Sequence, residues 1–418
     1  MRAAARIMRM KVLLLSISDR IGGASIGAYR LHRSLLSAGI DSHMLVLYKS
    51  TADPTVHRLA AQLDLVARAR RRLAERQHKG RLRDNPRRPE SDHWSLNQFD
   101  YPVAAAINRF SADIVHLHWV GDNFLPIGQL PRINAPLVCT LRDSWFFTGG
   151  CHYPGDCRRF RHGCGDCPQL LSGGAKDLSA SVFRHKQRAF AAANLTVVAL
   201  GDWIAGRAQE SALLGAARME VIGNAIDGRM FKPLDRAQAR RACNLPQDKR
   251  LLLFGALGGT SDKRKGFAHL QAALAGIGTE AGIELVVFGA DQPETLDMSL
   301  PLHQVGRLAD ELSMSLLYSA CDVFVLPSLQ DTSPKTVMEA LACGIPCVAF
   351  AGSGAADMIR QRGNGYLARL PDSDDLRAGI LWALAQSWDR AALHDEIIAR
   401  YGEAPIARQH IRLYQSLL

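Results

Sequence analysis

Short apolar runs rich in Val, Leu and Ile recur along the chain, and amphipathic helical patterns separate them. Continuous apolar runs are typical of parallel strands that are buried on both faces of a sheet. Helical patterns at residues 27–38 and 331–342 are examples of the segments between them. The runs predict strands at residues 11–17, 42–48, 114–119, 137–141, 195–200, 250–256, 283–289, 323–327 and 346–351.

This alternation of strand and helix occurs twice, which predicts an α/β protein with two doubly wound, Rossmann-like parallel-sheet domains. A length of 418 residues suits two domains better than one. We expect domains at residues 1–220 and 221–390, with a helical tail at 391–418 that packs back toward the first domain. Ligands of such sheets bind beyond the carboxyl ends of the strands, so we expect the site in the cleft between the domains.

The composition, with 47% apolar and 22% charged residues, excludes a wholly disordered chain. No run approaches the roughly 18 apolar residues of a membrane-spanning helix. The apolar stretch at residues 12–17 is followed at once by Asp19 and Arg20, and it is too short for a signal peptide. We therefore expect a cytoplasmic protein.

The positive charge is concentrated in the first half of the chain. Residues 1–200 hold 29 basic and 15 acidic side chains, a balance of +14, whereas the remainder has a balance of −3. Residues 58–88 alone hold 11 basic and 3 acidic residues. Such a segment is either a solvated face or a surface for an anionic membrane, phosphorylated substrates or nucleic acid. Nucleic acid is the least favoured, because no aromatic residue interrupts the segment for base stacking.

Two segments carry candidate chemistry. Gly22 and Gly23 follow the first strand and open a helix, an arrangement that lets backbone N–H groups approach an anion. In residues 327–346, Asp331 precedes Glu339 by eight residues, which is about 12 Å along a helix. The carboxyl groups of a retaining glycoside hydrolase are only about 5–5.5 Å apart. The pair is therefore better suited to hold two parts of one extended ligand.

Together these segments resemble the retaining glycosyltransferases of family four, whose fold is the two-domain GT-B type. The resemblance extends over nearly the whole chain from Lys11, and the segment 140–170 (TLRDSWFFTGGCHYPGDCRRFRHGCGDCPQL) is most similar to the colanic-acid and exopolysaccharide branch. The other matching segments are the Gly22-Gly23 loop, DIVHLHW (113–119), VIGNAIDGRMFKP (221–233), DKRKGF (262–267), LYSACDVFVLPS (317–328) and the Asp331–Glu339 segment.

The resemblance implies roles for individual residues. Asp331 and Glu339 occupy the two positions of the family's E-x7-E motif, with Asp331 at the donor sugar and Glu339 at the ribose. Lys265 matches the lysine that contacts the donor diphosphate, where negative charge builds as the glycosidic bond opens. Further donor-binding candidates are Gly22, Gly23, Arg264, Thr332, Ser333 and Thr336. The resemblance implies front-face displacement with retention and no divalent metal at the donor.

The chain departs from the family pattern at three positions. Asp331 is one methylene shorter than the usual glutamate, and Gly255 is followed by Ala256 where the family usually has an arginine. Arg142 stands in the strand-end motif where many members carry a histidine. A guanidinium stays protonated and cannot act as a base, so Arg142 and its neighbour Asp143 are positioning candidates. His118 is an acceptor-side candidate, with a buried structural histidine as the alternative.

Four cysteines are close together in the sequence, in a glycine-rich loop. In a chain without a signal peptide, such a cluster favours a structural zinc site over disulfides. Four thiolates leave no open coordination position for catalysis. The alternatives are reduced thiols, or His152 and His162 as substitute ligands. The cysteines are Cys151, Cys157, Cys164 and Cys167.

These observations predict a retaining hexosyltransferase that uses a nucleotide-sugar donor in cell-surface polysaccharide biosynthesis. The expected acceptor is a glycan or an undecaprenyl-linked glycan, reached by peripheral binding to the anionic inner face of the membrane. The principal alternative is a nucleotide-sugar epimerase of the same fold. A zinc-bearing nucleic-acid-binding protein is a weaker one.

Overall fold

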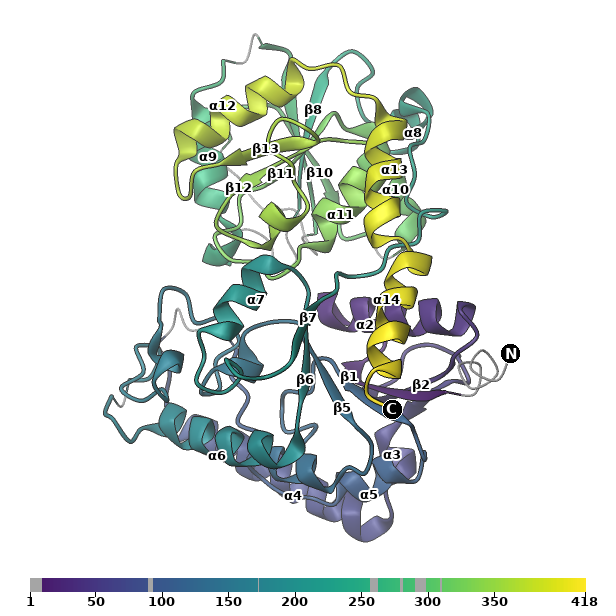
Figure 1. The fold of residues 1–418 in the computed structure, drawn as a ribbon. Coiled ribbons are helices and arrows are strands. Elements are labelled where there is room, and N and C mark those ends of the chain that lie inside the picture. Colours follow the sequence, from purple (N-terminus) through teal and green to yellow (C-terminus); the bar gives the residue numbers. More distant parts are fainter. Residues whose placement is uncertain are drawn as a thin grey trace. The chain divides into compact units, whose positions relative to one another are not determined.

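The protein is described by a computed structural model. The residues that it describes are 10–88, 93–171, 173–255, 262–278, 281–289, 298–308 and 310–418. The chain forms two compact units: unit 1 comprises Met1–Ala225 and Ile406–Leu418, and unit 2 comprises Ile226–Pro405 (Figure 1).

Unit 1 is built on a parallel sheet with the strand order β3-β2-β1-β4-β5-β6-β7. All six pairings are parallel. The order reverses direction beside β1, which is the topological switch point where doubly wound sheets bind ligands. The strands are β1 (Lys11–Ser18), β2 (Asp41–Tyr48), β3 (Val56–Arg58), β4 (Ile114–Leu117), β5 (Leu137–Leu141), β6 (Thr196–Ala199) and β7 (Met219–Val221).

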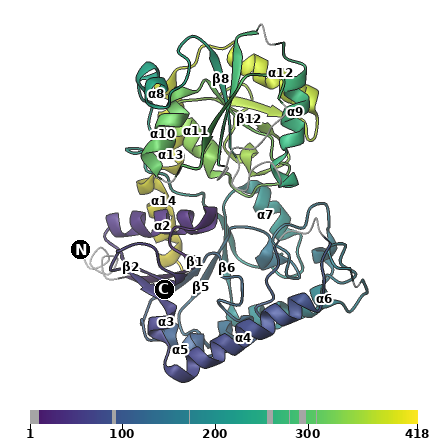
Figure 2. The same ribbon diagram turned by 180° about the vertical axis from the view of Figure 1, so that it is seen from behind.

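The helices of unit 1 connect and cover these strands. Helix α2 packs against β1 and β2, and α7 packs against β6 and β7 (Figure 2). Strands β1, β4, β5 and β6 are almost wholly buried, which is why they read as continuous apolar runs. The α-helices are α2 (Gly22–Ser37), α3 (Leu59–Gln62), α4 (Leu65–Arg83), α5 (Val103–Asn108), α6 (Leu178–Ala193), α7 (Asp202–Gln209) and α14 (Glu403–Gln415).

The last residues of the chain complete the core of unit 1. The hydroxyl of Tyr414 on α14 lies 2.6 Å from Nδ1 of His116 on β4. The other ring nitrogen of His116 lies 2.7 Å from the Thr140 hydroxyl on β5. All three side chains are buried, so each polar atom in this chain of contacts has its partner inside the protein.

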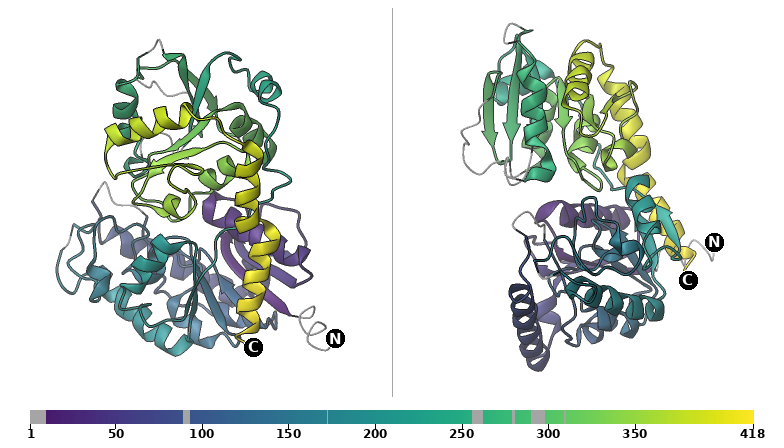
Figure 3. Two further views of the ribbon diagram at one scale, coloured as in Figure 1. Left: turned by 45° about the horizontal axis from the view of Figure 1, so that its top comes forward. Right: turned by 90° about the vertical axis from the view of Figure 1, so that its left-hand side faces the viewer.

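Unit 2 contains a second parallel sheet, with the order β10-β9-β8-β11-β12-β13. Its strands are β8 (Arg250–Gly255), β9 (Ile283–Phe288), β10 (Leu302–Gly306), β11 (Val323–Leu326), β12 (Cys347–Phe350) and β13 (Gly365–Ala368). Helices α9 and α12 pack together, as do α11 and α13 (Figure 3). The α-helices are α8 (Arg236–Ala242), α9 (Phe267–Ala275), α10 (Glu311–Ala320), α11 (Lys335–Ala342), α12 (Ser373–Leu384) and α13 (Arg390–Tyr401).

The predicted fold class, two doubly wound parallel sheets, is confirmed. All nine predicted strands are present with ends within two residues of those expected. The pattern missed β3, β7, β10 and β13, which are the four edge strands of the two sheets. Helix α11 begins at Lys335 rather than at Asp331, because Pro334 takes the position before its first turn.

Several buried histidines make unit 1 sensitive to acid. Burial lowers the pKa of His32, His78 and His410 to about 4, so these rings are neutral in the folded state at pH 7. In the unfolded chain a histidine titrates near pH 6.5. The unfolded state therefore binds more protons as the pH falls below about 6.5. Each such histidine contributes stability that is present at high pH and is lost toward pH 4.

We predict that unit 1 loses stability before unit 2 on acidification. From pH 8 to pH 5, each of the three buried histidines removes about 2 kcal/mol of unfolding free energy. Hydrogen-exchange protection factors at the two pH values should fall in β1, β4 and α14. The internal control is unit 2, whose histidines (His269, His303 and His394) are all partly exposed. Equal loss of protection in both units would contradict this account.

Candidate active site

One group of candidate residues lies in unit 2, at the carboxyl ends of its strands. Lys265 belongs to a short turn that precedes α9, and Asp331 belongs to the loop that follows β11. Lys265 Nζ lies 2.7 Å from Asp331 Oδ2. Both side chains are about one-fifth exposed, at 22% and 19%. The structure thus brings together a cation and a carboxylate that are 66 residues apart in sequence, at the edge where such sheets bind ligands.

A glycine allows this contact. Gly266 has a left-handed backbone with φ +68°, and a Cβ added there would lie 1.9 Å from the carbonyl oxygen of Pro327. The backbone N–H of Leu329 also donates to the carbonyl of Arg264 at 2.8 Å. The turn that carries Lys265 therefore lies directly against the loop that follows β11. Any side chain larger than a hydrogen atom at position 266 would prevent this approach.

The other donor-binding candidates of unit 2 lie in the same turn, in the loop after β11 and at the start of α11. Arg264 forms an ion pair of 2.8 Å with Asp262 in its own turn. Thr332 is buried, whereas Ser333 and Thr336 are partly exposed. The backbone N–H of Gly354 donates to the Asp331 carbonyl at 2.8 Å, which braces the loop from the other side.

Glu339 lies on α11, within the same edge of unit 2. Its side chain is only 6% exposed, and it accepts a hydrogen bond of 3.2 Å from the hydroxyl of Tyr318 on α10. Burial and the nearby Glu339 carboxylate raise the pKa of Tyr318 well above its usual value, so this hydroxyl remains a donor. A buried carboxylate held by a neutral donor is suited to accept hydrogen bonds from a neutral hydroxyl-bearing ligand.

Two polar residues that the sequence analysis did not select lie beside Asp331. Within the part of the chain that the structure describes, the Ser328 hydroxyl and the Gln330 amide nitrogen are buried and have no hydrogen-bond partner. Unpartnered buried polar atoms cost free energy and commonly occur where a protein binds a polar ligand. The available signal was their position in the PSLQDTS segment, directly before Asp331.

A second group of candidates lies in unit 1, beyond β1. Gly22 has φ +80°, and no atom lies within 4 Å of where its Cβ would be, so this backbone faces open space. Gly22 and Gly23 form the first turn of α2, which contains no acidic residue. The Ser18 hydroxyl accepts from the N–H of Ile21 at 2.9 Å and fixes the turn. The turn therefore exposes backbone and no acidic side chain, and its binding of an anion stays a prediction.

Arg142 follows β5 in unit 1 and has only neutral partners. Its guanidinium donates to the Asn224 side-chain oxygen and lies 3.1 Å from His118 Nδ1. Among the described residues no carboxylate pairs with it. Burial lowers the pKa of Arg142 to about 9, which still leaves it charged at pH 7. Gly27 makes room for it, because a Cβ there would lie 2.4 Å from Arg142 Nη1.

The neighbours of Arg142 have supporting positions. His118 is 1% exposed, and burial holds its pKa well below the usual range, so it is a neutral ring beside Arg142. Its other nitrogen, Nε2, has no partner among the described residues. The Asp143 carboxylate accepts from Trp119 Nε1 at 2.7 Å, from the Trp145 N–H at 2.8 Å and from His152 Nδ1 at 2.7 Å. Asp143 therefore holds three neighbouring groups inside unit 1 and has a structural position.

The predicted zinc site finds no support. Among the described residues, which include all four cysteines of the cluster, no group of three or more His, Cys, Asp and Glu side chains could hold a metal ion. Burial raises the pKa of Cys151 well above its usual value and that of Cys164 to about 12, so both are thiols in the metal-free protein. His152 is not a substitute ligand, because Asp143 and the Ser95 hydroxyl occupy its two nitrogens.

A buried lysine holds the segment that leads into the cysteine loop. Lys186 on α6 is fully buried and donates to the carbonyl oxygens of Trp145 and Thr148. Its Nζ atom lies 3.7 Å from the centroid of the Trp145 ring, and burial lowers the pKa of this amine to about 7. These contacts connect the segment before the loop to α6.

Two further expectations concern the segment after Gly255 and the lack of a membrane-spanning helix. The segment after Gly255, where the family usually has an arginine, lies outside the described residues. Over the described helices, none combines the length and apolar character needed to cross a membrane.

Family models match both units of the chain. The model described as Glycosyltransferase Family 4 matches residues 21–228, and the model described as Glycosyl transferases group 1 matches residues 248–386. The first contains the Gly22–Gly23 turn and Arg142. The second contains Lys265, Asp331 and Glu339.

Curated relatives are similar over part of their length. A D-inositol 3-phosphate glycosyltransferase of Mycolicibacterium paratuberculosis is 29% identical over 222 residues, which cover 45% of this chain and 48% of the relative. The enzyme of the same name from Stackebrandtia nassauensis is 27% identical over 211 residues, or 43% and 47% of the two chains. This chain thus spans about half the length of the curated relatives it matches.

Solved structures show the same fold over nearly the whole chain. Sucrose-phosphate synthase from Thermosynechococcus elongatus has a TM-score of 0.66 at 19% identity and covers 98% of this chain and 99% of its own. HepE from Anabaena, in complex with UDP and glucose, has a TM-score of 0.62 at 16% identity, with coverage of 98% and 100%. Because the two family models together match both parallel-sheet units, the chain belongs to the glycosyltransferases of the GT-B fold.

Proposed function

We propose that this chain is a retaining hexosyltransferase that transfers a sugar from a nucleotide-sugar donor to a glycan or lipid-linked glycan acceptor in cell-surface polysaccharide biosynthesis. The observation that carries the proposal is the Lys265–Asp331 contact of 2.7 Å at the carboxyl edge of the unit 2 sheet, in the loop that leads into the helix of Glu339. HepE, a structural neighbour, was solved with UDP-glucose, which supports a nucleotide sugar as the donor.

Each group at this edge fits one part of such a donor. Glu339 accepts hydrogen bonds and suits the ribose hydroxyls. Lys265 and the N-terminus of α11 suit the diphosphate, because the N-terminal end of a helix is electropositive and the first turn of α11 holds no acidic residue. Asp331, paired with Lys265, suits the hydroxyls of the sugar. Ser328 and Gln330 supply further hydrogen-bonding atoms.

The reaction requires that negative charge be stabilised on the leaving diphosphate as the glycosidic bond opens. In this chain Lys265 supplies the positive charge that stabilises the leaving diphosphate. Asp331 holds the Lys265 side chain in position before the donor binds. The acceptor hydroxyl attacks from the face that the diphosphate leaves and gives its proton to the departing diphosphate oxygen, so the product keeps the anomeric configuration of the donor. Within unit 2, Asp331 and Glu339 then act by binding and orienting the donor and not as an acid–base pair.

In unit 1, Arg142 fits an anionic group of a substrate. It is charged, half-buried and without a carboxylate partner in the described residues, and Asn224 and His118 orient it. Such a guanidinium gains most from a phosphate or carboxylate that enters from solution. The D-inositol 3-phosphate in the name of the curated relatives bears a phosphate, which agrees with an anionic group on the acceptor side.

Helix α4 of unit 1 fits an anionic membrane surface. Its inward side is formed by Ala67, Ala74 and His78, which are buried. Its exposed side carries basic residues together with three large apolar side chains. This combination is typical of helices that lie in a membrane interface. The exposed apolar residues are Leu65 at 80%, Val66 at 63% and Leu73 at 56%.

We predict that Glu339→Gln and Lys265→Ala each reduce transfer about ten- to a hundredfold, because each removes a charge-assisted contact worth about 1.5–3 kcal/mol. The matched control is Lys263→Ala, in the same turn but exposed, which should leave transfer unchanged. Transfer is measured with UDP-glucose, GDP-mannose and UDP-galactose, and the anomeric proton of the product is read by NMR. Normal rates in both site variants, an inverted product, or epimerised donor without transfer would contradict the proposal.

We predict that the protein binds anionic but not neutral liposomes. Each basic residue near an anionic bilayer contributes about 1 kcal/mol, and salt weakens the effect. Replacement of the α4 arginines by glutamine should abolish sedimentation with phosphatidylglycerol vesicles, whereas replacement by lysine, which keeps the charge, should preserve it. The residues to replace are Arg68, Arg70, Arg71, Arg72 and Arg76. Equal binding to both vesicle types, or no binding at low salt, would leave α4 as a solvated face.

A further inference from the structure

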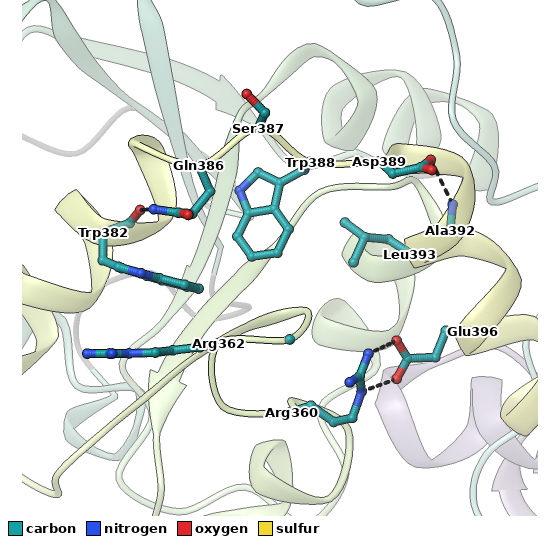
Figure 4. Close-up of a pocket in the computed structure, with 11 residues that line it drawn as sticks. Arg360, Arg362, Trp382, Gln386, Ser387, Trp388, Asp389, Ala392, Leu393 and Glu396 are labelled. Atoms are coloured by element: carbon teal, nitrogen blue, oxygen red, sulfur yellow. Dashed lines mark hydrogen bonds and ion pairs between the residues drawn. The ribbon is translucent and has the colours of Figure 1, made fainter.

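A separate pocket of about 330 Å³ lies in unit 2, between the turn before β13, the end of α12 and the start of α13 (Figure 4). The turn that lines it immediately precedes β13, whose first residue Gly365 pairs with Cys347, the first residue of β12. Lys265 and Asp331 lie at the opposite, carboxyl edge of this parallel sheet. The pocket is therefore distinct from the proposed donor site.

Two tryptophans form the walls of the pocket. Trp382 and Trp388 are both partly exposed, and their rings lie 5.7 Å apart at 81°, so they form a corner with two flat faces. The Trp388 N–H donates to the Ala383 carbonyl at 2.9 Å, and Trp382 packs against Tyr366 at 5.8 Å. Both rings are thus fixed before any ligand arrives. Figure 4 shows the Arg362 side chain below the Trp382 ring, with their flat faces turned toward one another.

The polar groups of the pocket are preorganised and balanced in charge. Arg360 forms a two-pronged pair with Glu396, with distances of 2.8 and 2.7 Å. The buried Asn364 side chain accepts from the Arg360 N–H at 2.7 Å and holds the turn. The two arginines of the lining are matched by two carboxylates, those of Asp389 and Glu396. This balance disfavours a phosphate or another strongly charged ligand.

We propose that this pocket binds a neutral sugar unit of a glycan. A pyranose ring presents an apolar face of C–H groups and an edge of hydroxyls. Indole faces bury the C–H face of the sugar, whereas planar guanidinium, carboxylate and amide groups bind its hydroxyls. The volume lies at the small end of the range for ligand pockets and suits one or two sugar units. Such a site, outside the donor edge, holds a polysaccharide near the enzyme between transfers.

The test is saturation-transfer NMR of the full chain with maltohexaose, cellohexaose and mannohexaose as probes. We expect at least one of them to bind with a Kd of about 1 mM or tighter. Trp388→Ala should weaken that binding about tenfold or more by removing one wall of the corner. The matched control is Trp203→Ala, a partly exposed tryptophan on α7 of unit 1, which should leave the Kd unchanged.

A second variant guards against misfolding. Arg362 has φ +60°, a backbone conformation that glycine adopts readily, so Arg362→Gly removes the guanidinium without straining the turn. Arg362→Gly should weaken binding of the same oligosaccharide, whereas the midpoint of thermal unfolding should stay at the wild-type value. No binding of any of the three oligosaccharides, or equal Kd values in wild type and both variants, would overturn the proposal. Binding of uridine in place of the sugars, lost in Trp388→Ala, would identify a nucleobase site and overturn it too.

Discussion

The close approach of Gly266 to the Pro327 carbonyl determines the geometry of the proposed donor site. Because no side chain intervenes, the turn that holds Lys265 lies against the loop that holds Asp331, and the two side chains meet at 2.7 Å. The same loop leads into α11, which carries Glu339. One backbone contact thus brings together two segments that are far apart in the sequence. A lysine paired in advance with a carboxylate is ordered before a ligand binds, which lowers the entropic cost of binding.

The two units place their charges differently. In unit 2 the candidate cation is paired with a carboxylate, and the pocket at the other edge of the sheet is balanced in charge. In unit 1 the described partners of Arg142 are neutral, and the buried, neutral His116 and His118 lie within and directly after β4. A charged group with neutral partners is the better receptor for an anion, whereas a balanced site is the better receptor for a neutral sugar.

The sequence predicted the interior of each sheet well and its margins poorly. Interior strands such as β5 are buried on both faces and form continuous apolar runs, whereas β3, β7, β10 and β13 are short edge strands. Asp331, Glu339 and Lys265 came from motifs. The ion pair between Lys265 and Asp331 could not be predicted from motifs, because it depends on a contact across 66 residues. The zinc expectation rested on the cysteine spacing, the glycine-rich loop and the lack of a signal peptide, none of which reveals that Lys186 enters the interior from α6. No motif marked Trp382 and Trp388.

The most direct test of the central claim is the affinity of nucleoside diphosphates for Gly266→Ala. UDP and GDP are titrated by calorimetry into the wild type, into Gly266→Ala and into Gly278→Ala, a glycine whose added Cβ would meet no atom within 4 Å. The account predicts that the wild type and Gly278→Ala bind one of the two nucleotides equally well. Gly266→Ala should bind that nucleotide about tenfold or more weakly, because Lys265 is displaced from the diphosphate. Equal affinity in all three proteins would contradict it.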